Sequence, residues 1–235
     1  MKTLIAIQCL LFAFIGQTAF GKFNWKANKW DKIDSKEGVN VYRKEVPDSD
    51  VLGVGGSAMI NAPVSKIIWV LMDHENKKDW VDKFESSKTI ENPSDLVSIQ
   101  YAAFDMPFPV SDRDFVYRYE FSYDPDKHMI TVDVKSVTHS SAPEEDTIGV
   151  RGEIKFGEYR LYPRKNGKKT YVEVEYMTDP KGYLPTMIVN MVQKSWPYKT
   201  LSSLRRQVQK SGIKHEKKIL DALGVQVDKR TAQNK

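Results

Sequence analysis

Residues Asp105–Tyr123 read DMPFPVSDRDFVYRYEFSY, and the two halves of this stretch have opposite conformational preferences. In the first half, Pro107 and Pro109 remove two backbone donors and push the preceding residues toward extended backbone, which predicts an irregular loop. The second half alternates between aromatic and other residues, as in a strand with one buried face. The predicted inward row consists of Phe115, Tyr117, Tyr119, Phe121 and Tyr123.

Arg113 has the same parity as these aromatic residues, so a cation begins the row that should point inward. A buried guanidinium costs several kcal/mol unless it is paired. Three interpretations therefore stay open: an ion pair within the protein, solvent exposure at the start of the strand, or contact with an anionic ligand. The carboxylates nearest in sequence belong to Asp105, Asp112 and Asp114.

Residues 1–21 have the organisation of a secretory signal peptide. Lys2 precedes the apolar run Leu4–Ile15, which is too short to span a bilayer comfortably. Ala19-Phe20-Gly21 places small residues at the two positions that a signal peptidase reads. We therefore expect the mature chain to begin near Lys22 and to be exported, to a periplasm or out of the cell. An uncleaved membrane anchor is the alternative.

The composition of the 235-residue chain excludes several classes of function. Cys9 is its only cysteine and lies in the predicted signal peptide, so the mature chain would have neither disulfides nor a thiol nucleophile. The formal net charge of +5 is modest for 36 basic and 31 acidic residues, and does not by itself argue for nucleic-acid binding. The length favours one domain, residues 22–210, followed by a basic tail, residues 211–235, partly helical or disordered.

Alternating segments recur between turn signals, which predicts a strongly curved antiparallel sheet of about eight or nine strands. In residues 150–162 the predicted inward-facing positions change from even-numbered to odd-numbered residues, which predicts a β-bulge at Gly157. In residues Leu96–Phe104, the odd-numbered apolar side chains, including Tyr101, are assigned to the inward face. The strand ranges are 38–46, 51–60, 86–90, 96–104, 115–123, 128–137, 150–162 and 170–178.

The segment Tyr183–Gln209 has apolar residues at helical spacing, and Pro197 should bend it near Gln193. These apolar residues lie on one side of the helix, so we expect that side to pack against the concave face of the sheet. Shorter helices are expected in residues 61–72, 75–84 and 213–223, and another around residues 23–33 that docks as a lid. The predicted fold class is therefore α+β, with a curved sheet gripping one long helix.

Motifs for catalysis and metal binding are missing from the sequence. The four histidines have no metal-ligand spacing, and there is no HExxH, GxSxG or phosphate-binding loop, so we predict no catalytic site, metal or cofactor. Asp105, Asp112 or Asp114 offers a general base, but nothing marks a paired acid. The aromatic row is expected to be buried, which argues against nucleic-acid stacking.

The residues of the central stretch and the long helix resemble the START (steroidogenic acute regulatory protein-related lipid transfer) domain family, of helix-grip fold, over nearly the whole mature chain. The most specific part is PFPVSDRDFVYRY (Pro107–Tyr119). Further similarity lies in Trp25 with GVNVYRK, in the Pro63 helix leading to Trp80, and in DPKGYLP with NMVQKSWPYKTLSSLRRQV.

This resemblance implies a tunnel between the sheet and the long helix that holds one lipid. Loop Asp105–Asp112 and helix residues Met187–Trp196 would form its gate. In members that carry phospholipid, the arginine of the corresponding motif lies at the polar end of the cavity, here Arg113. Tyr119 stands where some sterol-carrying relatives have arginine. The expected ligand-binding residues are Tyr101, Phe104, Met106, Phe108, Arg113, Phe115, Tyr117, Tyr119, Met187, Ile188, Met191, Val192 and Trp196.

The resulting hypothesis is a non-enzymatic, monomeric lipid-binding and lipid-transfer protein that carries one phospholipid, sterol or similar ligand. Its partners would be that lipid and, transiently, a membrane surface, with no nucleic acid. Two alternatives use the same fold: a cyclase- or aromatase-like enzyme acting on a buried hydrophobic substrate, and a sensor or interaction domain whose exposed helix signals occupancy.

Overall fold

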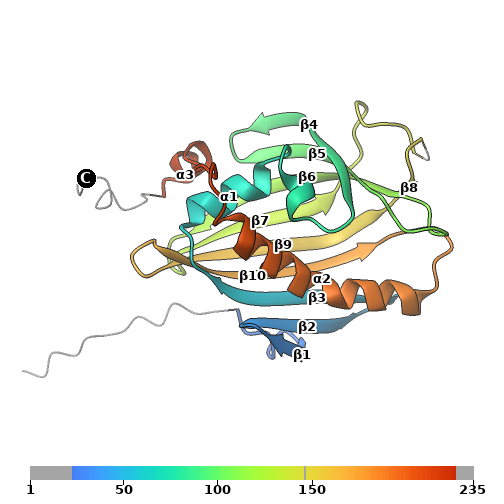
Figure 1. The fold of residues 1–235 in the computed structure, drawn as a ribbon, viewed down its shortest axis with the longest axis horizontal. Coiled ribbons are helices and arrows are strands. Elements are labelled where there is room, and N and C mark those ends of the chain that lie inside the picture. The colour runs from blue at the N-terminus through green and yellow to red at the C-terminus, as the bar shows by residue number, and fades with distance from the viewer. Residues whose placement is uncertain (1–22, 146, 226–235) are drawn as a thin grey trace, which may run out of the picture.

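The computed structural model describes residues 23–145 and 147–225, in which one curved sheet carries a long helix across one face (Figure 1). The strands are β1 (Asp31–Lys36), β2 (Val39–Val46), β3 (Ser49–Ile60), β4 (Phe84–Ser94), β5 (Val97–Phe104), β6 (Arg113–Asp124), β7 (Met129–Ser136), β8 (Val150–Arg151), β9 (Glu153–Arg164) and β10 (Lys169–Asp179). The helices are α1 (Val64–Met72), the 3-10 turn η1 (Lys77–Asp79), α2 (Thr186–Gln207) and α3 (Lys218–Ala222).

The sheet order over the described residues is β1-β2-β3-β10-β9-β7-β6-β5-β4, and the paired strands along this path are antiparallel. The short β8 adds one parallel pairing to the start of β6. The predicted α+β fold, with a curved antiparallel sheet and a long helix, is confirmed. The difference from eight or nine strands comes from β1 and β8, neither of which has the alternation of a half-buried strand.

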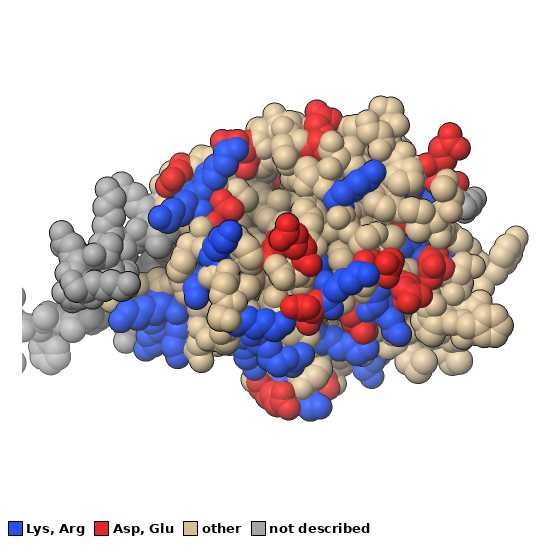
Figure 2. Space-filling view, turned by 45° about the horizontal axis from the view of Figure 1, so that its top comes forward, with Lys and Arg blue, Asp and Glu red and all other residues tan. Residues whose placement is uncertain are grey.

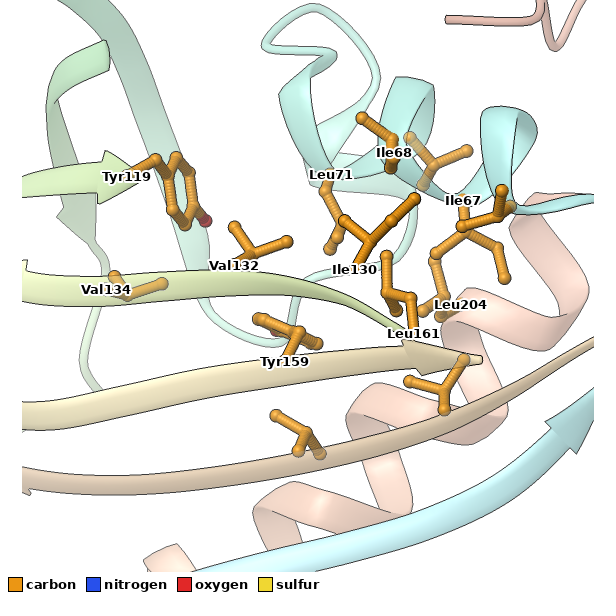
Figure 3. Close-up of a cluster of buried hydrophobic side chains, with 14 of the residues drawn as sticks. Ile67, Ile68, Leu71, Tyr119, Ile130, Val132, Val134, Tyr159, Leu161 and Leu204 are labelled. Carbon is orange, nitrogen blue, oxygen red and sulfur yellow. The ribbon is translucent and has the colours of Figure 1, made fainter. Parts of the chain in front are cut away.

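The core lies on the face of the sheet that α1 and α2 cover (Figure 3). Period-two alternation sends Ile130, Val132 and Val134 from β7 to this face, as predicted, and Tyr159 and Leu161 from β9 join them. Helix α1 adds Ile67, Ile68 and Leu71 from its apolar stripe, and α2 adds Leu204.

Helix α2 has one packed half and one exposed half. It contains Pro197 and changes direction along its length, as the proline predicts (Figure 1). In the second half, Leu201 and Leu204 are completely buried. A Cβ added to Gly56 of β3 would lie 2.9 Å from both Leu201 and Pro197, so glycine is what lets the helix approach. In the first half, Met187 is 79 % exposed.

Four local expectations are wrong. Around residues 23–33 the chain forms turns and β1, not a helix, because Trp25 lies flat on Tyr42 with ring centroids 4.2 Å apart, on the sheet face opposite to α2. The helix expected over residues 75–84 reduces to η1, and the one over 213–223 reduces to α3. The bulge expected at Gly157 lies two residues earlier, at Lys155, where the pairing of β9 with β10 shifts register. Gly157 itself pairs regularly, and it leaves room for the Tyr176 ring, 2.5 Å from where its Cβ would stand.

The predicted signal peptide, with Cys9, and the end of the predicted tail lie outside the described residues. Within residues 23–145 and 147–225, no helix combines the length and hydrophobicity needed to cross a bilayer. The described part of the tail packs on the core, because α3 buries Ile219 and Leu220 there.

Shortening Leu204 should show how firmly the second half of α2 is packed. We expect Leu204→Ala to lower the free energy of unfolding by about 2–5 kcal/mol, because the deleted methyl groups leave a cavity. Met187→Ala, on the exposed half of the same helix, should change it by less than about 0.5 kcal/mol. Urea unfolding followed by tryptophan fluorescence measures both, and equal losses would contradict the division of α2 into two halves.

Candidate functional site

The structure separates the predicted ligand-binding residues into three groups. Phe115, Tyr117 and Tyr119 are buried in the main core, with Phe104 and Trp196 packed against it at partial exposure. Tyr101 lies in a different cluster, with Ala103 and Val116. The exposed group comprises Phe108, Met187, Ile188, Met191 and Val192, and the half-buried Met106 lies in the same loop as Phe108.

The assignment of Tyr101 to the inward face is wrong. Tyr101 pairs with Val116 on β6, whose neighbours Phe115 and Tyr117 point inward, so Tyr101 points to the opposite face. Its hydroxyl donates to Asp114 Oδ2 at 3.0 Å, and Arg151 Nε donates to Asp114 Oδ1 at 2.6 Å. On β5 it is therefore the even-numbered residues, including the polar Gln100, that face the core.

One end of the molecule exposes large apolar side chains. Phe108 in the loop and Tyr183 just before α2 are almost fully exposed, and Met187 and Met191 project from the first half of α2. This end lies on the right in Figures 1 and 2, where the surface is largely uncharged. It coincides with the predicted gate, so the gate residues form a surface patch rather than walls of an enclosed space. We call Phe108, Tyr183, Met187, Ile188, Met191 and Val192 the apolar end.

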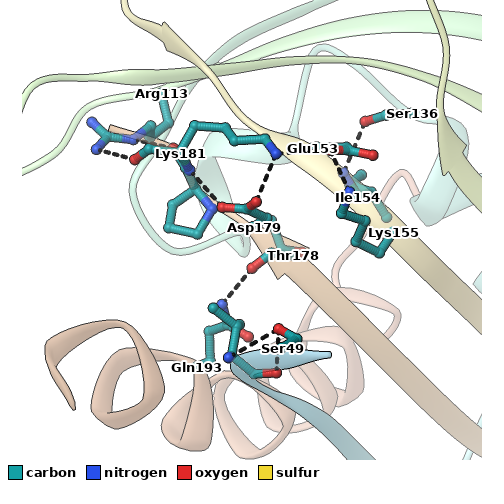
Figure 4. A network of polar contacts seen from close by, with 12 residues as sticks. Ser49, Arg113, Ser136, Glu153, Ile154, Lys155, Thr178, Asp179, Lys181 and Gln193 are labelled. Carbon is teal, nitrogen blue, oxygen red and sulfur yellow. Dashed lines mark hydrogen bonds and ion pairs between the residues drawn. The ribbon is translucent and has the colours of Figure 1, made fainter. Parts of the chain in front are cut away.

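Arg113 fastens two segments of the apolar end to each other. Its Nε donates to Pro180 O at 2.7 Å and its Nη2 to Lys181 O at 3.2 Å, which holds the connection between β10 and α2 (Figure 4). Its Nη1 donates to the carbonyl oxygens of Ser111 and Asp112, which holds the end of the proline-rich loop. The buried guanidinium is thus satisfied by backbone carbonyls, an arrangement outside the three interpretations left open by the sequence.

The first half of α2 is held mainly through polar contacts. Gln193 Nε2 donates to Thr178 O at 2.6 Å (Figure 4). Asn190 donates to Asp50 O at 3.0 Å and accepts from the Leu52 backbone N–H at 3.0 Å. Most of its apolar side chains face outward, although Val189 is buried and Trp196 packs on the core, so less hydrophobic burial opposes movement of this half than of the second half.

Lys77 is a buried cation that the sequence analysis did not identify. It lies on η1 and is only 4 % exposed, yet its Nζ has a single hydrogen bond, to Gln100 Oε1 at 3.4 Å, and lies 6.0 Å from the centre of the Tyr119 ring. Burial lowers the pKa of Lys77 to about 8, and Asp73 acts in the opposite direction. An amine this poorly partnered inside a protein is costly unless another group compensates for it.

The surroundings of Lys77 form a polar patch on the core side of the sheet. Gln100 also accepts a hydrogen bond from the Tyr117 hydroxyl at 3.4 Å, and its Nε2 donates to Ser98 Oγ at 3.3 Å. Burial raises the pKa of Tyr119 to about 12, so its hydroxyl is neutral near pH 7. We call Lys77, Ser98, Gln100, Tyr117 and Tyr119 the inner polar patch. It offers one cation and several hydroxyl or amide groups to a polar ligand group.

Two pockets of about 320 and 340 Å³ open at the surface. The first lies where α3 meets β4 and β5, and Ser98 of the inner polar patch lines it. The second lies between the segment after η1 and the second half of α2. Neither lies under the first half of α2, so the predicted tunnel stays a prediction. In the described ranges no three His, Cys, Asp or Glu side chains are grouped as metal ligands.

Replacing Lys77 should change how stability depends on pH in the ligand-free protein. Unfolding raises the pKa of this amine from about 8 to its ordinary value, so the unfolded chain binds more protons and stability rises with pH above 8. We expect Lys77→Met to be about 3 kcal/mol more stable than wild type at pH 7 and to lose this rise. Urea unfolding at pH 7 and 9.5 measures both.

The exposed neighbour Lys78 supplies the control for that experiment. Lys78→Met should keep the pH dependence of the wild type and change stability by less than about 1 kcal/mol. If Lys77→Met and wild type gain the same stability between pH 7 and 9.5, the amine of Lys77 is not buried as described.

Replacing Arg113 should loosen both segments that it fastens. The single nitrogen of a lysine cannot span the carbonyls that the guanidinium reaches, so Arg113→Lys should lower stability by roughly 1.5–3 kcal/mol. Hydrogen exchange read by mass spectrometry should speed up in residues 105–112 and 180–185, and stay unchanged in α1. Arg43→Lys, at an exposed position of β2, is the control. Exchange that accelerates nowhere would contradict the fastening role.

The chain is similar to known proteins both in sequence and in structure. The START domain family profile matches residues 16–214. An uncharacterized protein of Pseudomonas aeruginosa, PA1579, is 27 % identical over 214 residues, covering 89 % of this chain and all of that protein. The phosphatidylcholine transfer protein of Mus musculus is 27 % identical over 176 residues, covering 71 % of this chain and 77 % of that protein.

Solved structures agree with this assignment. Human STARD10 superimposes with a TM-score of 0.70 at 20 % identity, covering 78 % of this chain and 74 % of that chain. A STAR-related lipid transfer protein fragment from Xanthomonas axonopodis gives a TM-score of 0.64 at 25 % identity, covering 77 % of this chain and 99 % of that chain. The family match spans most of the sequence, and the curved sheet with its long helix is the fold of these structures. The chain belongs to the START domain family.

Proposed function

We propose that the protein binds one lipid with an anionic polar group, between the sheet and α2, and transfers it between membranes without changing it chemically. Membership of the START family and similarity to a phosphatidylcholine transfer protein support lipid binding in general. The observation that carries the finer proposal is Lys77, a cation in the core whose only hydrogen bond among the described residues is to a neutral amide. A phosphate or carboxylate beside its Nζ would supply the missing counter-charge.

The energetics suit carriage of this kind. Each buried methylene contributes ~0.8 kcal/mol, so a sixteen-carbon chain offers about 12 kcal/mol before the cost of ordering the ligand. One charge-assisted hydrogen bond to Lys77 adds roughly 1.5–3 kcal/mol. The acyl chain would therefore hold the ligand in the protein, and the inner polar patch would select its polar group.

Entry of the ligand would require the first half of α2 to move away from the sheet. That half is held by polar contacts such as those of Asn190 and Gln193, whereas Leu201 and Leu204 anchor the second half. A membrane surface would favour the movement, because it offers an apolar environment to the apolar end while the ligand passes. The loop and the first half of α2 thus keep the role of gate that the sequence predicted.

Arg113 has a different part in this proposal from the one that the sequence suggested. Four donor contacts to carbonyl oxygens occupy its guanidinium, so it stabilises the hinge of the gate instead of facing the ligand. Contact between Arg113 and a lipid head group stays a prediction. The two roles differ in their consequences, since a hinge residue alters the rate of transfer whereas a head-group residue alters the choice of lipid.

Export completes the proposal. Residues 1–21, outside the described part of the chain, would direct it into a periplasm or out of the cell, where it would carry lipid through an aqueous space. Lys199 of α2 already pairs with Asp82, and Lys210, just after α2, pairs with Asp79, so apolar contact would dominate the approach to a membrane.

The test is the identity of the lipid that the protein retains. Native mass spectrometry of protein purified from an exporting host should show one bound species of several hundred daltons. After incubation with vesicles containing phosphatidylglycerol, fatty acid and cholesterol, Lys77→Met should bind the anionic lipids about tenfold more weakly and cholesterol unchanged. Lys77→Arg should retain anionic lipid, and Lys78→Met should behave as wild type.

The outcomes separate the alternatives. Protein that stays free of lipid with every vesicle would overturn carriage. Loss of head-group preference in Arg113→Lys but not in Lys77→Met would move the polar site to Arg113. Conversion of the bound molecule into a product would favour the cyclase-like enzyme, and a protein partner captured only with ligand bound would favour the sensor.

A further inference from the structure

The pocket beside α3 lies at the other end of the molecule from the apolar end; in Figure 1, α3 is at the left and the first half of α2 at the right. Its volume is about 320 Å³, which holds on the order of ten non-hydrogen atoms at the ~30 Å³ that a water molecule occupies. Met72 and Phe121 form an apolar part of its wall, and both belong to the main core. Asp95, Glu216 and Lys218 contribute a charged part. The pocket therefore suits a small group with both polar and apolar surface.

One side chain, Gln100, connects this pocket to Lys77. Gln100 Oε1 accepts from Lys77 Nζ at 3.4 Å, and Gln100 Nε2 donates to Ser98 Oγ at 3.3 Å. The same Nε2 lies 3.9 Å from Met72 Sδ. Because Ser98 and Met72 both line the pocket, a polar group held beside Lys77 would be within one side chain of it.

The charged groups of the pocket favour an uncharged ligand group. Lys218 Nζ pairs with Asp95 Oδ1 at 2.7 Å, and Glu216 Oε1 accepts from the Ile219 backbone N–H at 3.2 Å. A second cation would compete with Lys218 for Asp95, whereas an anion would face two carboxylates and one amine. A hydroxyl group meets neither difficulty, because it donates to carboxylate oxygens, which have several lone pairs, and accepts from an ammonium group.

Ser98 adds a buried donor at the inner end of the pocket. Its residue is 3 % exposed, and within residues 23–145 and 147–225 its Oγ has no hydrogen-bond partner other than Gln100, from which it accepts. The hydroxyl proton of Ser98 is therefore available to an oxygen of a ligand. Buried polar groups are nearly always hydrogen-bonded, so this free donor indicates that a polar group binds here.

We propose that the pocket beside α3 binds an uncharged, polyhydroxylated head group, such as glycerol or inositol, while the phosphate of the same lipid lies beside Lys77. The inference rests on the proposed function and names the class of lipid, a phosphodiester of a polyol. Its single negative charge would balance Lys77. Its hydroxyl groups would bind Ser98, Asp95 and Lys218, and its C–H groups would pack on Phe121.

The test compares lipids that differ only in the head group. The purified protein is incubated with vesicles that hold equal amounts of phosphatidylglycerol, phosphatidylinositol, phosphatidylpropanol and phosphatidylethanolamine, all with the same acyl chains, and the retained lipids are measured by mass spectrometry. Phosphatidylpropanol has the charge and the three head-group carbons of phosphatidylglycerol but no free hydroxyl group. We expect at least one of the two polyol lipids to be retained about tenfold over phosphatidylpropanol and phosphatidylethanolamine, as two or three hydrogen bonds would give. Which of the two is retained distinguishes glycerol from inositol.

Two variants at exposed positions place this preference in the pocket. Asp95→Ala removes an acceptor, so the preference for polyol lipid over phosphatidylpropanol should fall from about tenfold to about twofold. Asp124→Ala removes the carboxylate of another exposed pair, outside the pocket, and should keep the tenfold preference. Asn92→Trp narrows the pocket and should also lower the preference, whereas Ser86→Trp, exposed on the same strand and outside the pocket, should not.

The outcomes separate this inference from the function on which it rests. Equal retention of phosphatidylpropanol and the polyol lipids would overturn the inference and leave lipid carriage standing. Preferential retention of phosphatidylethanolamine would overturn it too, because the pocket would then select an ammonium group. A polyol preference that survives both Asp95→Ala and Asn92→Trp would place the head group elsewhere. If no lipid is retained from any vesicle, carriage itself is wrong.

Discussion

The packing of the second half of α2 against β2 and β3 is the constraint on which the rest of the structure depends. Leu201 and Pro197 can approach β3 only because Gly56 leaves space for them, and this contact fixes one end of the helix. The outward-facing Met187 and Met191 mean that the other end gains little from staying closed. One helix therefore combines a buried half with a largely exposed half, and Pro197 lies between them.

Lys77 shows how a site can lower the stability of the protein that contains it. In the ligand-free chain its amine has one long hydrogen bond to an amide, so burial costs free energy that the surrounding core must offset. Apolar side chains would pack in its place at no such cost, so a buried amine that forms no ion pair with a described carboxylate is the feature to expect where a ligand brings the opposite charge. The core cluster can offset the free energy of burying Lys77, because most of its residues lie outside the proposed gate.

Sequence periodicity predicts the strands and the long helix because most inward positions are apolar. It fails at β5, where Gln100 faces the core and Tyr101 faces away, since the outer side of β5 and β6 carries an apolar cluster of its own. It also misses Lys77, since a lysine within the charged run NKKDW is typical of a solvated surface. The parity of Arg113 in its strand indicates a buried cation. The sequence does not show that its partners are the backbone carbonyls of Pro180 and Lys181, 67 and 68 residues later.

In the proposed carrier, the two buried cations of the inner face would have different roles, one in positioning the ligand and one in movement of the gate. Arg113 binds backbone carbonyl oxygens, which carry no net charge. Breaking these hydrogen bonds separates no ion pair, so the contacts would suit a hinge that opens and closes. Lys77 lies on η1, beside the fixed core, where a charged contact with the ligand would persist while the gate moves. In the proposed complex, a polar group held beside Lys77 would direct the apolar chain of the ligand toward the gate. The apolar chain is the part of the ligand that a membrane can accept first.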